Sequence, residues 1–353
     1  MAKKYHGLNG DLDFIFNQNK HIWKKLKNKN LFLTGCTGPF GFWLIKSLLY
    51  ADEKISLNCK IFVLTRNKNS DFFKYFASKS IKVVYGDVRK FKFFKKRIDL
   101  IIHGATTTAK ETFNNQDPIE KFSVLFDGTN RVLEFAKKSK AKKFLFLSSG
   151  AVYGNRDKKI KFTESSRLAP NTNDLNFDVS VLGEAKRAAE LSSIIFSNKN
   201  FCKVNIARCF SFIGPYMPLG VHYAVGNFFW NSINKNKILI NGNPKTSRSY
   251  LHFVDLTIIL WRILLSNKNR EIFNIGSDKS VSMITLSKKI KKIIPDVKIK
   301  IIKNSNQKAI SHYIPSIQKI KKHFNFKINY SLDQSLKKMY QNILQNKKFY
   351  NIK

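Results

Sequence analysis

Acidic residues are scarce in this chain. Its 353 residues contain 23 Asp and Glu against 64 Lys and Arg, which gives a formal net charge of +41. Such an excess is typical of proteins that meet nucleic acid or another anionic surface. The basic residues are mostly Lys, however, and they are spread along the whole sequence. We therefore expect a bias of composition and no nucleic-acid partner, with a positive field that attracts a phosphate-bearing substrate.

Cysteines and long apolar runs are also few. The four cysteines are Cys36, Cys59, Cys202 and Cys209. They show neither CxxC spacing nor the spacing of metal ligands, so we expect no metal site and a reducing compartment. The first residues lack the apolar stretch of a secretory signal. The longest apolar segment, Leu251–Leu265, is interrupted by Asp255 and Arg262 and is too short to cross a bilayer, which predicts a soluble cytoplasmic protein without a membrane partner.

The segment LFLTGCTGPFGFWLIKSLL, residues 31–49, has the pattern of a strand, a tight turn and a helix. Its glycines are Gly35, Gly38 and Gly41. In a dinucleotide-binding turn the first glycine allows the sharp bend, the second lets backbone N–H groups approach a pyrophosphate, and the third lets the helix pack closely on the sheet. The positive end of the helix dipole then faces the phosphates. This segment therefore predicts dinucleotide binding.

Further apolar runs alternate with helical patterns along the chain. The runs interpreted as strands are Lys60–Leu64, the segment IKVVYGDV that ends in Gly86 and Asp87, Ile98–Ile102, Phe144–Leu147 and Lys203–Arg208. The helical patterns include Ile119–Lys138 and Ser180–Ser197. Strands that alternate with helices of this length predict an α/β fold with a Rossmann-type, doubly wound parallel sheet. Ligands of such sheets bind beyond the carboxyl ends of the strands.

Three regions are predicted. Residues 1–29 form an N-terminal helical extension, with an amphipathic piece at Phe14–Leu26. Residues 30–208 form the dinucleotide-binding domain, to which residues 250–278 return. Residues 209–249 and 279–353 form a smaller C-terminal α/β lobe for the substrate, which closes over the cofactor cleft. Its expected elements are a helix near Asn227–Asn234, a short strand Ile238–Ile240 and a helix at about Leu332–Leu344.

The residues after the second predicted strand bear on the type of cofactor. An acidic side chain at this place binds the ribose 2′-OH of NAD, whereas an Arg accommodates the 2′-phosphate of NADP. This chain has Thr65 and Arg66 and no carboxylate there. The sequence therefore favours NADP(H), and NAD(H) remains an alternative.

Several motifs in order make the chain resemble the extended short-chain dehydrogenase/reductases, the NAD(P)-dependent sugar-nucleotide epimerases and dehydratases. The matching stretches are TGCTGPFG, YGDV, IIHGAT, FLSSGAVYG, LGEAKRAAE, ARCFSFIGPY, RSYLHFVDL and FNIGS. The resemblance covers about residues 30–345. It implies a bound nicotinamide cofactor, a nucleoside-diphosphate sugar, and hydride removal from the sugar, often at C4, with surface-polysaccharide assembly as the setting. It also implies a homodimer in which the helices near residues 118–138 and 178–197 form a four-helix bundle.

The resemblance carries roles over to individual positions. The implied cofactor-binding residues are Gly35, Thr37, Gly38, Phe40, Gly41, Arg66, Asp87, Val88, Ala105 and Lys186. The implied substrate-binding residues are Ser149, Asn227 and Arg248. Ser149 matches the active-site Ser or Thr that hydrogen-bonds the reacting hydroxyl, and Lys186 matches the Lys that holds the nicotinamide ribose. Arg248 matches an Arg that commonly contacts the substrate diphosphate.

One position departs from the family pattern. Four residues before Lys186, where the family places its catalytic Tyr, this chain has Leu182, which can neither take nor give a proton. A positioned acid–base group contributes about 10²–10⁴-fold in rate, so another proton carrier is needed. Tyr153 is the nearest alternative, and Lys186 without its Tyr is another. Further candidates in the following loop are Tyr216, His222 and Tyr223.

A second departure from the family pattern reduces the number of possible reactions. The 4,6-dehydratases of the family carry an Asp-Glu pair just after the active-site Thr, whereas this chain has Gly150 and Ala151. Epimerisation, 4-keto reduction and 4-oxidation therefore remain. Because of Leu182, a catalytically impaired NAD(P)-binding sensor or scaffold protein of the same fold is the alternative to an enzyme.

Overall fold

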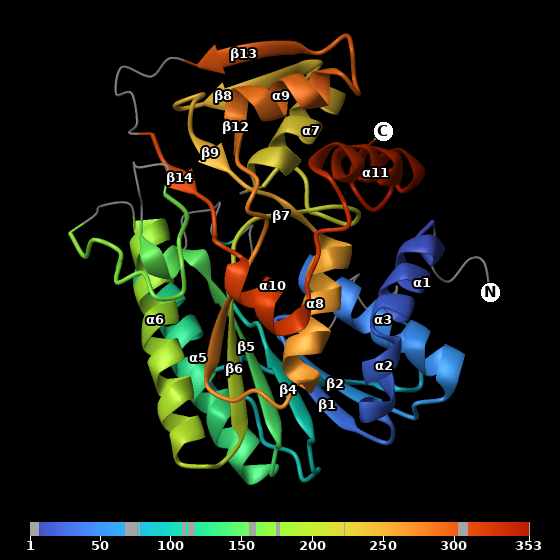
Figure 1. Ribbon diagram of the computed structural model, residues 1–353, viewed down its shortest axis with the longest axis vertical. Coiled ribbons are helices and arrows are strands. Elements are labelled where there is room, and N and C mark those ends of the chain that lie inside the picture. Colours follow the sequence, from blue (N-terminus) through green and yellow to red (C-terminus); the bar gives the residue numbers. More distant parts are fainter. Residues whose placement is uncertain are drawn as a thin grey trace.

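The centre of the protein is a parallel seven-stranded sheet (Figure 1). The computed structural model describes residues 7–67, 76, 78–107, 111, 117–154, 160–173, 177–221, 223–302 and 310–352. The strands of the sheet are β1 (Asn30–Thr34), β2 (Lys60–Thr65), β3 (Ile81–Tyr85), β4 (Leu100–His103), β5 (Lys143–Ser149), β6 (Lys203–Cys209) and β11 (Glu271–Ile275). Their order is β11-β6-β5-β4-β1-β2-β3, and neighbours pair in parallel. The order reverses beside β1, where the glycine-rich turn begins.

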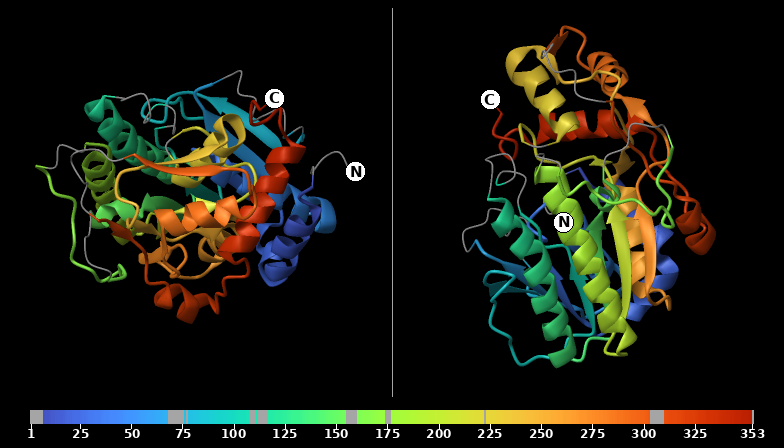
Figure 2. Two further views of the ribbon diagram at one scale, coloured as in Figure 1. Left: turned by 90° about the horizontal axis from the view of Figure 1, so that it is seen from above. Right: turned by 90° about the vertical axis from the view of Figure 1, so that its left-hand side faces the viewer.

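Helices cover both faces of this sheet, and each face has its own apolar core. Alternate strand residues point to opposite faces, so Leu31 and Leu33 of β1 pack with α3 (Pro39–Ile55) and α8 (Phe253–Leu265), whereas Phe32 packs with α5 (Pro118–Lys138). On the face that carries α5, α6 (Phe177–Asn198) lies beside α5 (Figures 1 and 2). The central strands are therefore buried on both sides, which explains their continuous apolar runs. The predicted doubly wound fold is confirmed.

The N-terminal segment forms two helices instead of one. The bounds are Asn9–Gln18 for α1 and Lys20–Trp23 for α2, followed by the 3₁₀ turn η2 (Lys24–Leu26). The break is at Asn19, whose fully buried amide donates to the carbonyl of Ile258 at 3.2 Å and accepts from Nε of Arg262 at 3.0 Å. These bonds to α8 compete with the helical path, so the predicted helical extension is divided at Asn19, inside the amphipathic piece at Phe14–Leu26.

The fourth strand also begins later than predicted, at Leu100 instead of Ile98. The N–H of Ile98 donates to the carbonyl of Ser139, and a carboxylate oxygen of Asp99 accepts from the N–H of Asn30 at 3.0 Å. Ile98 and Asp99 therefore belong to the turn that precedes the strand.

A smaller α/β lobe lies beyond the carboxyl ends of the strands (Figures 1 and 2). Its strands and helices are α7 (Ala224–Lys235), β8 (Lys237–Asn241), β9 (Ser247–Arg248), β12 (Val281–Ser282), α9 (Met283–Lys291), β13 (Lys298–Ile302), β14 (His312–Tyr313) and α11 (Leu332–Gln345). Strands β12, β9 and β14 form one small sheet, and β13 and β8 form another. The segments between the lobe and the large sheet are η4 (Gly150–Tyr153), β7 (Phe212–Ile213), β10 (Leu251–His252) and α10 (Gln318–Phe324). No helix in the described part of the chain has the length and apolar character needed to span a membrane.

Candidate active site

The glycine turn after β1 leaves one open position between two crowded ones. Gly35 has a left-handed φ of +70°, and a Cβ built there would lie 2.2 Å from the backbone of Gly104. A Cβ on Gly41 would lie 2.1 Å from the carbonyl oxygen of Cys36. A Cβ on Gly38 would meet nothing within 4 Å. The first and third glycines are thus required by close backbone packing, and the second faces open space.

Helix α3 begins at this open position. Gly38 is its N-cap, and no side chain caps the free N–H groups, while Pro39 occupies the first turn. Unsatisfied N–H groups and the helix dipole make such an end favourable for an anion. The turn therefore fits a pyrophosphate, which is the group the sequence assigned to it.

The other residues predicted for the cofactor surround this turn. Thr37 is exposed, and Phe40 is half-buried with its ring 5.0 Å from that of Phe212. The buried N–H of Ala105 donates to the hydroxyl of Thr34 at 3.2 Å, which joins the ends of β4 and β1. Val88 is buried and packs against Gly128 of α5, where a Cβ would lie 2.7 Å from it.

Two of the predicted cofactor residues are already engaged with charged partners. Arg66 donates from Nη2 to both carboxylate oxygens of Glu111 at 2.8 and 3.0 Å. Asp87 accepts from Nε and Nη2 of Arg89 at 3.0 and 2.7 Å, and these hydrogen bonds hold the pKa of its carboxyl below the usual value. Glu111 had no motif around it, so sequence reasoning missed the carboxylate that faces Arg66.

Ser149 and Lys186 lie at the carboxyl end of β5. Ser149 is the last residue of the strand, and its hydroxyl caps η4 by accepting from the N–H of Ala151 at 3.1 Å. Lys186, on α6, donates from Nζ to the carbonyl of Leu147 at 2.8 Å, and its ammonium lies 4.6 Å from the ring centroid of Phe146. Burial lowers the pKa of Lys186 to about 8. The structure therefore places this amine in a state that titrates near neutral pH.

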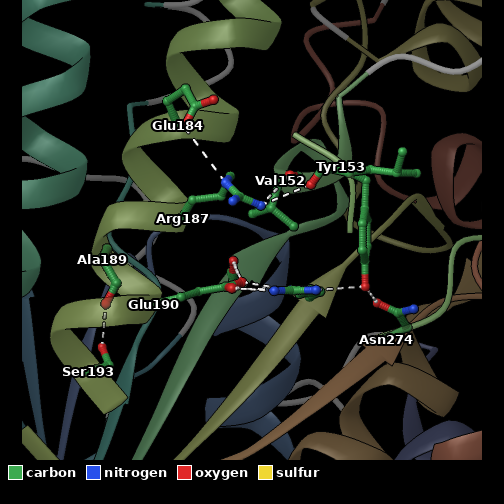
Figure 3. A network of polar contacts seen from close by, with 11 residues as sticks. Val152, Tyr153, Glu184, Arg187, Ala189, Glu190, Ser193 and Asn274 are labelled. Carbon is green, nitrogen blue, oxygen red and sulfur yellow. Dashed lines mark hydrogen bonds and ion pairs between the residues drawn. The ribbon is translucent and has the colours of Figure 1, made fainter. Parts of the chain in front are cut away.

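Tyr153 lies inside the protein, in a buried polar network (Figure 3). Its hydroxyl donates to Oδ1 of Asn274 at 2.9 Å and accepts from Nη1 of Arg208 at 2.8 Å. Arg208 is also bound through Nε and Nη2 to Glu190 of α6, which accepts a further bond from Ser148 at 2.6 Å. Burial raises the pKa of Tyr153. The hydroxyl of Tyr153 thus both donates and accepts a hydrogen bond within the network that joins α6 to β5, β6 and β11.

The substrate residues predicted from the resemblance lie in the lobe. Arg248, in β9, is half-buried and donates to the carbonyl of Ser247 at 2.9 Å, and desolvation lowers its pKa. Among the described residues no carboxylate forms an ion pair with it. Asn227 lies half-buried in the first turn of α7. A half-buried guanidinium without a carboxylate partner is suited to an anionic group of a ligand.

Two tyrosines that the sequence did not single out flank Arg248. The ring of Tyr313 has its centroid 5.7 Å from the guanidinium, and its phenol oxygen lies 2.6 Å from where a Cβ on Gly150 would be. Tyr250 is the second, and burial raises its pKa to about 12. No motif marked Tyr313, because its approach to Gly150 depends on the pairing of β14 with β9.

Leu182 and the remaining proton-carrier candidates differ in position. Leu182 is half-buried on α6, one turn before Lys186. Tyr216 is buried, with its ring 4.1 Å from that of Phe42, and its N–H donates to Tyr350 at 2.7 Å. Tyr223 is the partly exposed N-cap residue of α7. His222 lies outside the described residues.

Comparisons with known proteins agree with this arrangement. A model of the NAD-dependent epimerase/dehydratase family matches residues 31–276. UDP-glucuronic acid decarboxylase 1 of Arabidopsis thaliana is 25% identical over 314 residues, which make up 89% of this chain and 69% of that protein. An epimerase structure from Methanothermobacter thermautotrophicus matches with a TM-score of 0.81 at 20% identity over 98% of both chains. The dTDP-glucose 4,6-dehydratase of Bacillus anthracis, in complex with NAD, matches with a TM-score of 0.74 at 19% identity over 92% of this chain and 99% of that one. These two structures show the shared fold.

Proposed function

Because the chain belongs to the NAD-dependent epimerase/dehydratase family, we propose that it binds a nicotinamide coenzyme and a nucleoside-diphosphate sugar. The proposed reaction is hydride transfer at C4 of the sugar, by an epimerase, a 4-keto reductase or a 4-dehydrogenase. The observation that carries this proposal is the open position at Gly38, which precedes the uncapped start of α3 at the edge of the sheet where β5 ends in Ser149.

Each residue of the site has a role in this proposal. The coenzyme, when bound, supplies the hydride acceptor and donor. The N–H groups at the start of α3 would hold its diphosphate, and the amine of Lys186 would bind the nicotinamide ribose. Ser149 would hydrogen-bond the C4 oxygen. Arg248, which has no carboxylate partner among the described residues, would bind the diphosphate of the sugar nucleotide, with Asn227 near the nucleoside.

The contacts of Arg66 favour NAD(H) over NADP(H). Its guanidinium is held by both carboxylate oxygens of Glu111, so binding a 2′-phosphate requires that ion pair to break. A carboxylate near the end of β2 suits a free ribose 2′-OH. We therefore expect tighter binding of NAD⁺ than of NADP⁺, which titration of the stripped protein with each coenzyme measures.

A two-step experiment tests the function. The purified, stripped protein is first titrated with NAD⁺, NADH, NADP⁺ and NADPH. The form that binds is then incubated with UDP-glucose, UDP-N-acetylglucosamine, UDP-glucuronic acid and dTDP-glucose. We expect a change of nicotinamide absorbance or a new sugar nucleotide with at least one of them. A protein that takes up no nicotinamide coenzyme contradicts the proposal at its first step.

Leu182 motivates the alternative of a catalytically impaired sensor or scaffold. If the missing Tyr had silenced the site, Leu182→Tyr would raise the rate by about 10²–10⁴-fold, which is the usual contribution of a positioned acid–base group. If another residue carries the proton, the added phenol brings no gain and fills space built for Leu. Measuring kcat of both forms with the same sugar nucleotide separates the two functions.

The setting of the protein is part of the same proposal. All four cysteines are buried free thiols, as is typical of a protein in a reducing cytoplasm. We place the reaction there, in the supply of sugar nucleotides for surface-polysaccharide assembly, and we propose a homodimer formed through α5 and α6.

A further inference from the structure

Lysines gather at the edge of the central sheet that lies opposite the candidate active site. Because all seven strands are parallel, the segments that lead into them meet at this edge (Figure 1, lower end of the view). These segments are residues 24–30, 56–60, 78–81, 95–100, 139–143, 199–203 and 266–271, and each ends in the first residue of its strand. We call the seven segments together the basic edge.

The basic edge carries more positive charge than the composition of the chain explains. Its 38 residues include 16 Lys and Arg and two acidic residues, whereas the whole chain has 64 basic and 23 acidic residues in 353. The frequency of basic residues at this edge is therefore more than twice the average. Lysines that are spread along the sequence come together here because each of the seven segments contributes at least one.

Few of these charges are neutralised within the fold. Asp99 lies 3.8 Å from Nζ of Lys29 and 4.0 Å from Nε of Arg97. The exposed lysines of the edge that form no ion pair within the described part of the chain include Lys95, Lys96, Lys140, Lys142, Lys203 and Lys268. Burial, and after it the charges of Lys25 and Lys203, lower the pKa of Lys143. These cations repel one another, so an external anionic surface would stabilise them.

A hollow in the basic edge has only cations among its charged lining residues. It has a volume of about 540 Å³ and lies between the C-terminal ends of α5 and α6. Its charged lining residues are Lys137, Lys140, Lys142 and Lys203. Phe201 lines it too, with 38% of its surface exposed and its ring centroid 4.3 Å from Nζ of Lys137. The edge thus offers positive charge together with one exposed apolar ring.

The composition of the basic edge argues against a nucleic acid as its partner. Lys supplies 14 of the 16 cations, and both arginines are engaged, Arg97 beside Asp99 and Arg270 through a 2.6 Å bond from Nη1 to Asn198. Arg is the residue that recognises phosphates and base edges through paired hydrogen bonds. Phe201 is the one aromatic residue in the seven segments, so successive bases have no platform on which to stack.

The helices that end at this edge argue against a discrete phosphate site. Helices α3, α5, α6 and α8 all point their C-terminal ends here, where carbonyl groups and the negative end of the dipole repel anions. Lys25 and Lys143 already donate to the carbonyl of Leu265 at 3.4 and 3.1 Å. Attraction of anions must therefore come from many side chains acting together, over a sheet edge about 30 Å wide for strands about 4.8 Å apart.

We propose that the basic edge docks on an anionic lipid surface. Each Lys or Arg near such a surface contributes about fivefold to the binding constant, and an exposed ring such as that of Phe201 adds an apolar contact at the level of the headgroups. The sequence expectation of no membrane partner rested on the lack of a long apolar segment, which this electrostatic contact does not need. The docked protein would hold Gly38 and Ser149 away from the membrane, open to solution. This inference does not depend on the proposed function.

Co-sedimentation with vesicles tests the docking of the full chain. At low salt the protein should sediment with phosphatidylcholine vesicles that contain about one third phosphatidylglycerol, and should stay in solution with vesicles of phosphatidylcholine alone. Added salt should weaken the binding, because it screens exposed charges. A protein that sediments with neither kind of vesicle, or equally with both, contradicts the proposal.

Charge reversal at the basic edge tests which lysines bind. Lys140→Glu/Lys142→Glu should weaken vesicle binding by at least about 20-fold, because two attractive charges are lost and two repulsive ones replace them. Lys298→Glu/Lys300→Glu is the matched control, since both lysines are exposed on β13 in the lobe and the net charge changes equally. It should bind within about twofold of the wild type, with circular dichroism to confirm both folds. Equal weakening in the two variants would mean that net charge alone binds the vesicles.

Hydrogen exchange of the wild type maps the contact without any substitution. Anionic vesicles should slow exchange in residues 137–142 and 199–203 and leave residues 35–41 unchanged. Protection of residues 35–41 instead would place the lipid at the glycine turn and overturn the inference. So would single-stranded RNA that protects the basic edge at a salt concentration where the vesicles do not. Failure of the coenzyme and sugar-nucleotide assays leaves the inference standing, since vesicle binding requires neither ligand.

Discussion

At the scale of single residues, the buried amine of Lys186 links the site to the stability of the fold. Its pKa is about 8 in the folded protein, because burial disfavours the charged form, against 10.5 when unfolded. Below pH 8 both states carry the proton, so the folded state bears the full cost of the buried charge. Between pH 8 and 10.5 the folded state loses the proton first, so this cost is relieved and stability rises with pH.

Lys186→Met isolates this effect. The free energy of unfolding of the wild type, relative to that of Lys186→Met, should increase by about 1 kcal/mol from pH 7 to pH 9, since each pKa unit corresponds to about 1.4 kcal/mol. Urea unfolding of both proteins at the two pH values measures this difference. A difference that stays constant, or that moves against the wild type, shows that Lys186 is not titrating in this range.

Sequence motifs identified some residues of the candidate site and missed others. Ser149 and Lys186 were assigned because the stretches FLSSGAVYG and LGEAKRAAE resemble motifs of the family, and such a resemblance needs only the local sequence. Tyr313 was missed, since the segment SHYIP has no pattern that predicts contact with a strand more than 150 residues earlier. Glu111 was missed for the same reason. Residues that meet through the lobe need the tertiary structure.

At the scale of elements, the buried ion pair of Glu190 and Arg208 fixes α6 on the sheet. The pair joins α6 to β6 and, through Ser148 and Tyr153, to β5 and η4, and Lys186 lies one turn before Glu190. Removal of one partner leaves a buried charge unpaired, which typically costs about 3–5 kcal/mol. Glu190→Met is expected to destabilise the protein by this amount in guanidinium unfolding.

The double variant Glu190→Met/Arg208→Met is the control for that prediction. With neither charge left in the interior, it should be less destabilised than Arg208→Met and Glu190→Met combined, and more stable than the worse single variant. Additive losses would show that the two side chains do not stabilise each other.

The N-terminal helices are a second element that stabilises the whole fold. Trp23 is fully buried with its ring 5.6 Å from that of Trp261 on α8, and Asp11 accepts bonds from Tyr330 and from Lys338 on α11 at 2.8 Å each. The extension therefore contacts both the large domain and the C-terminal helix. Its packing was predictable from the amphipathic pattern, but the break at Asn19 was not, because it depends on partners in α8.

Trp23→Ala should lower the free energy of unfolding by about 3–5 kcal/mol, the usual cost of removing a buried Trp. Chemical denaturation followed by circular dichroism gives the value. Lys24→Ala, at the exposed neighbouring position, is the matched control and should change stability by less than about 0.5 kcal/mol. Equal losses in the two variants would mean that the extension does not contribute through this contact.

At the scale of the whole molecule, the charge of +41 sets the long-range field, and it affects binding rather than fold. The parallel central sheet followed from the alternation of apolar runs with helical patterns, whereas the small sheet β12-β9-β14 has strands of two residues that leave no periodic signal. This small sheet carries Arg248 and Tyr313. The part of the fold that is hardest to predict therefore contains the residues that the lobe contributes to the candidate site.

The face formed by α5 and α6 carries apolar side chains that the described chain does not cover. Leu191 is 62% exposed and Ile195 49%, one turn apart on α6, and Ile119 on α5 is 79% exposed. Such residues on two adjacent helices fit the proposed four-helix interface, in which the same face of a second copy covers them. The two helices lie side by side on the outside of the molecule (Figure 2).

Leu191→Asp/Ile195→Asp should convert the dimer to a monomer, because four carboxylates would be buried at the twofold interface without partners. Sedimentation velocity at micromolar concentration measures the change, with circular dichroism to confirm that the fold is kept. Leu344→Asp is the matched control, since Leu344 is 47% exposed on α11, away from α5 and α6, and it should remain dimeric. A wild-type protein that sediments as a monomer throughout, or a double variant that stays dimeric, contradicts the interface. Helix α6 also carries Lys186. If the partner subunit stabilises this helix, loss of the dimer should lower the affinity for the coenzyme. Titration of the monomeric variant with NAD⁺ measures this affinity.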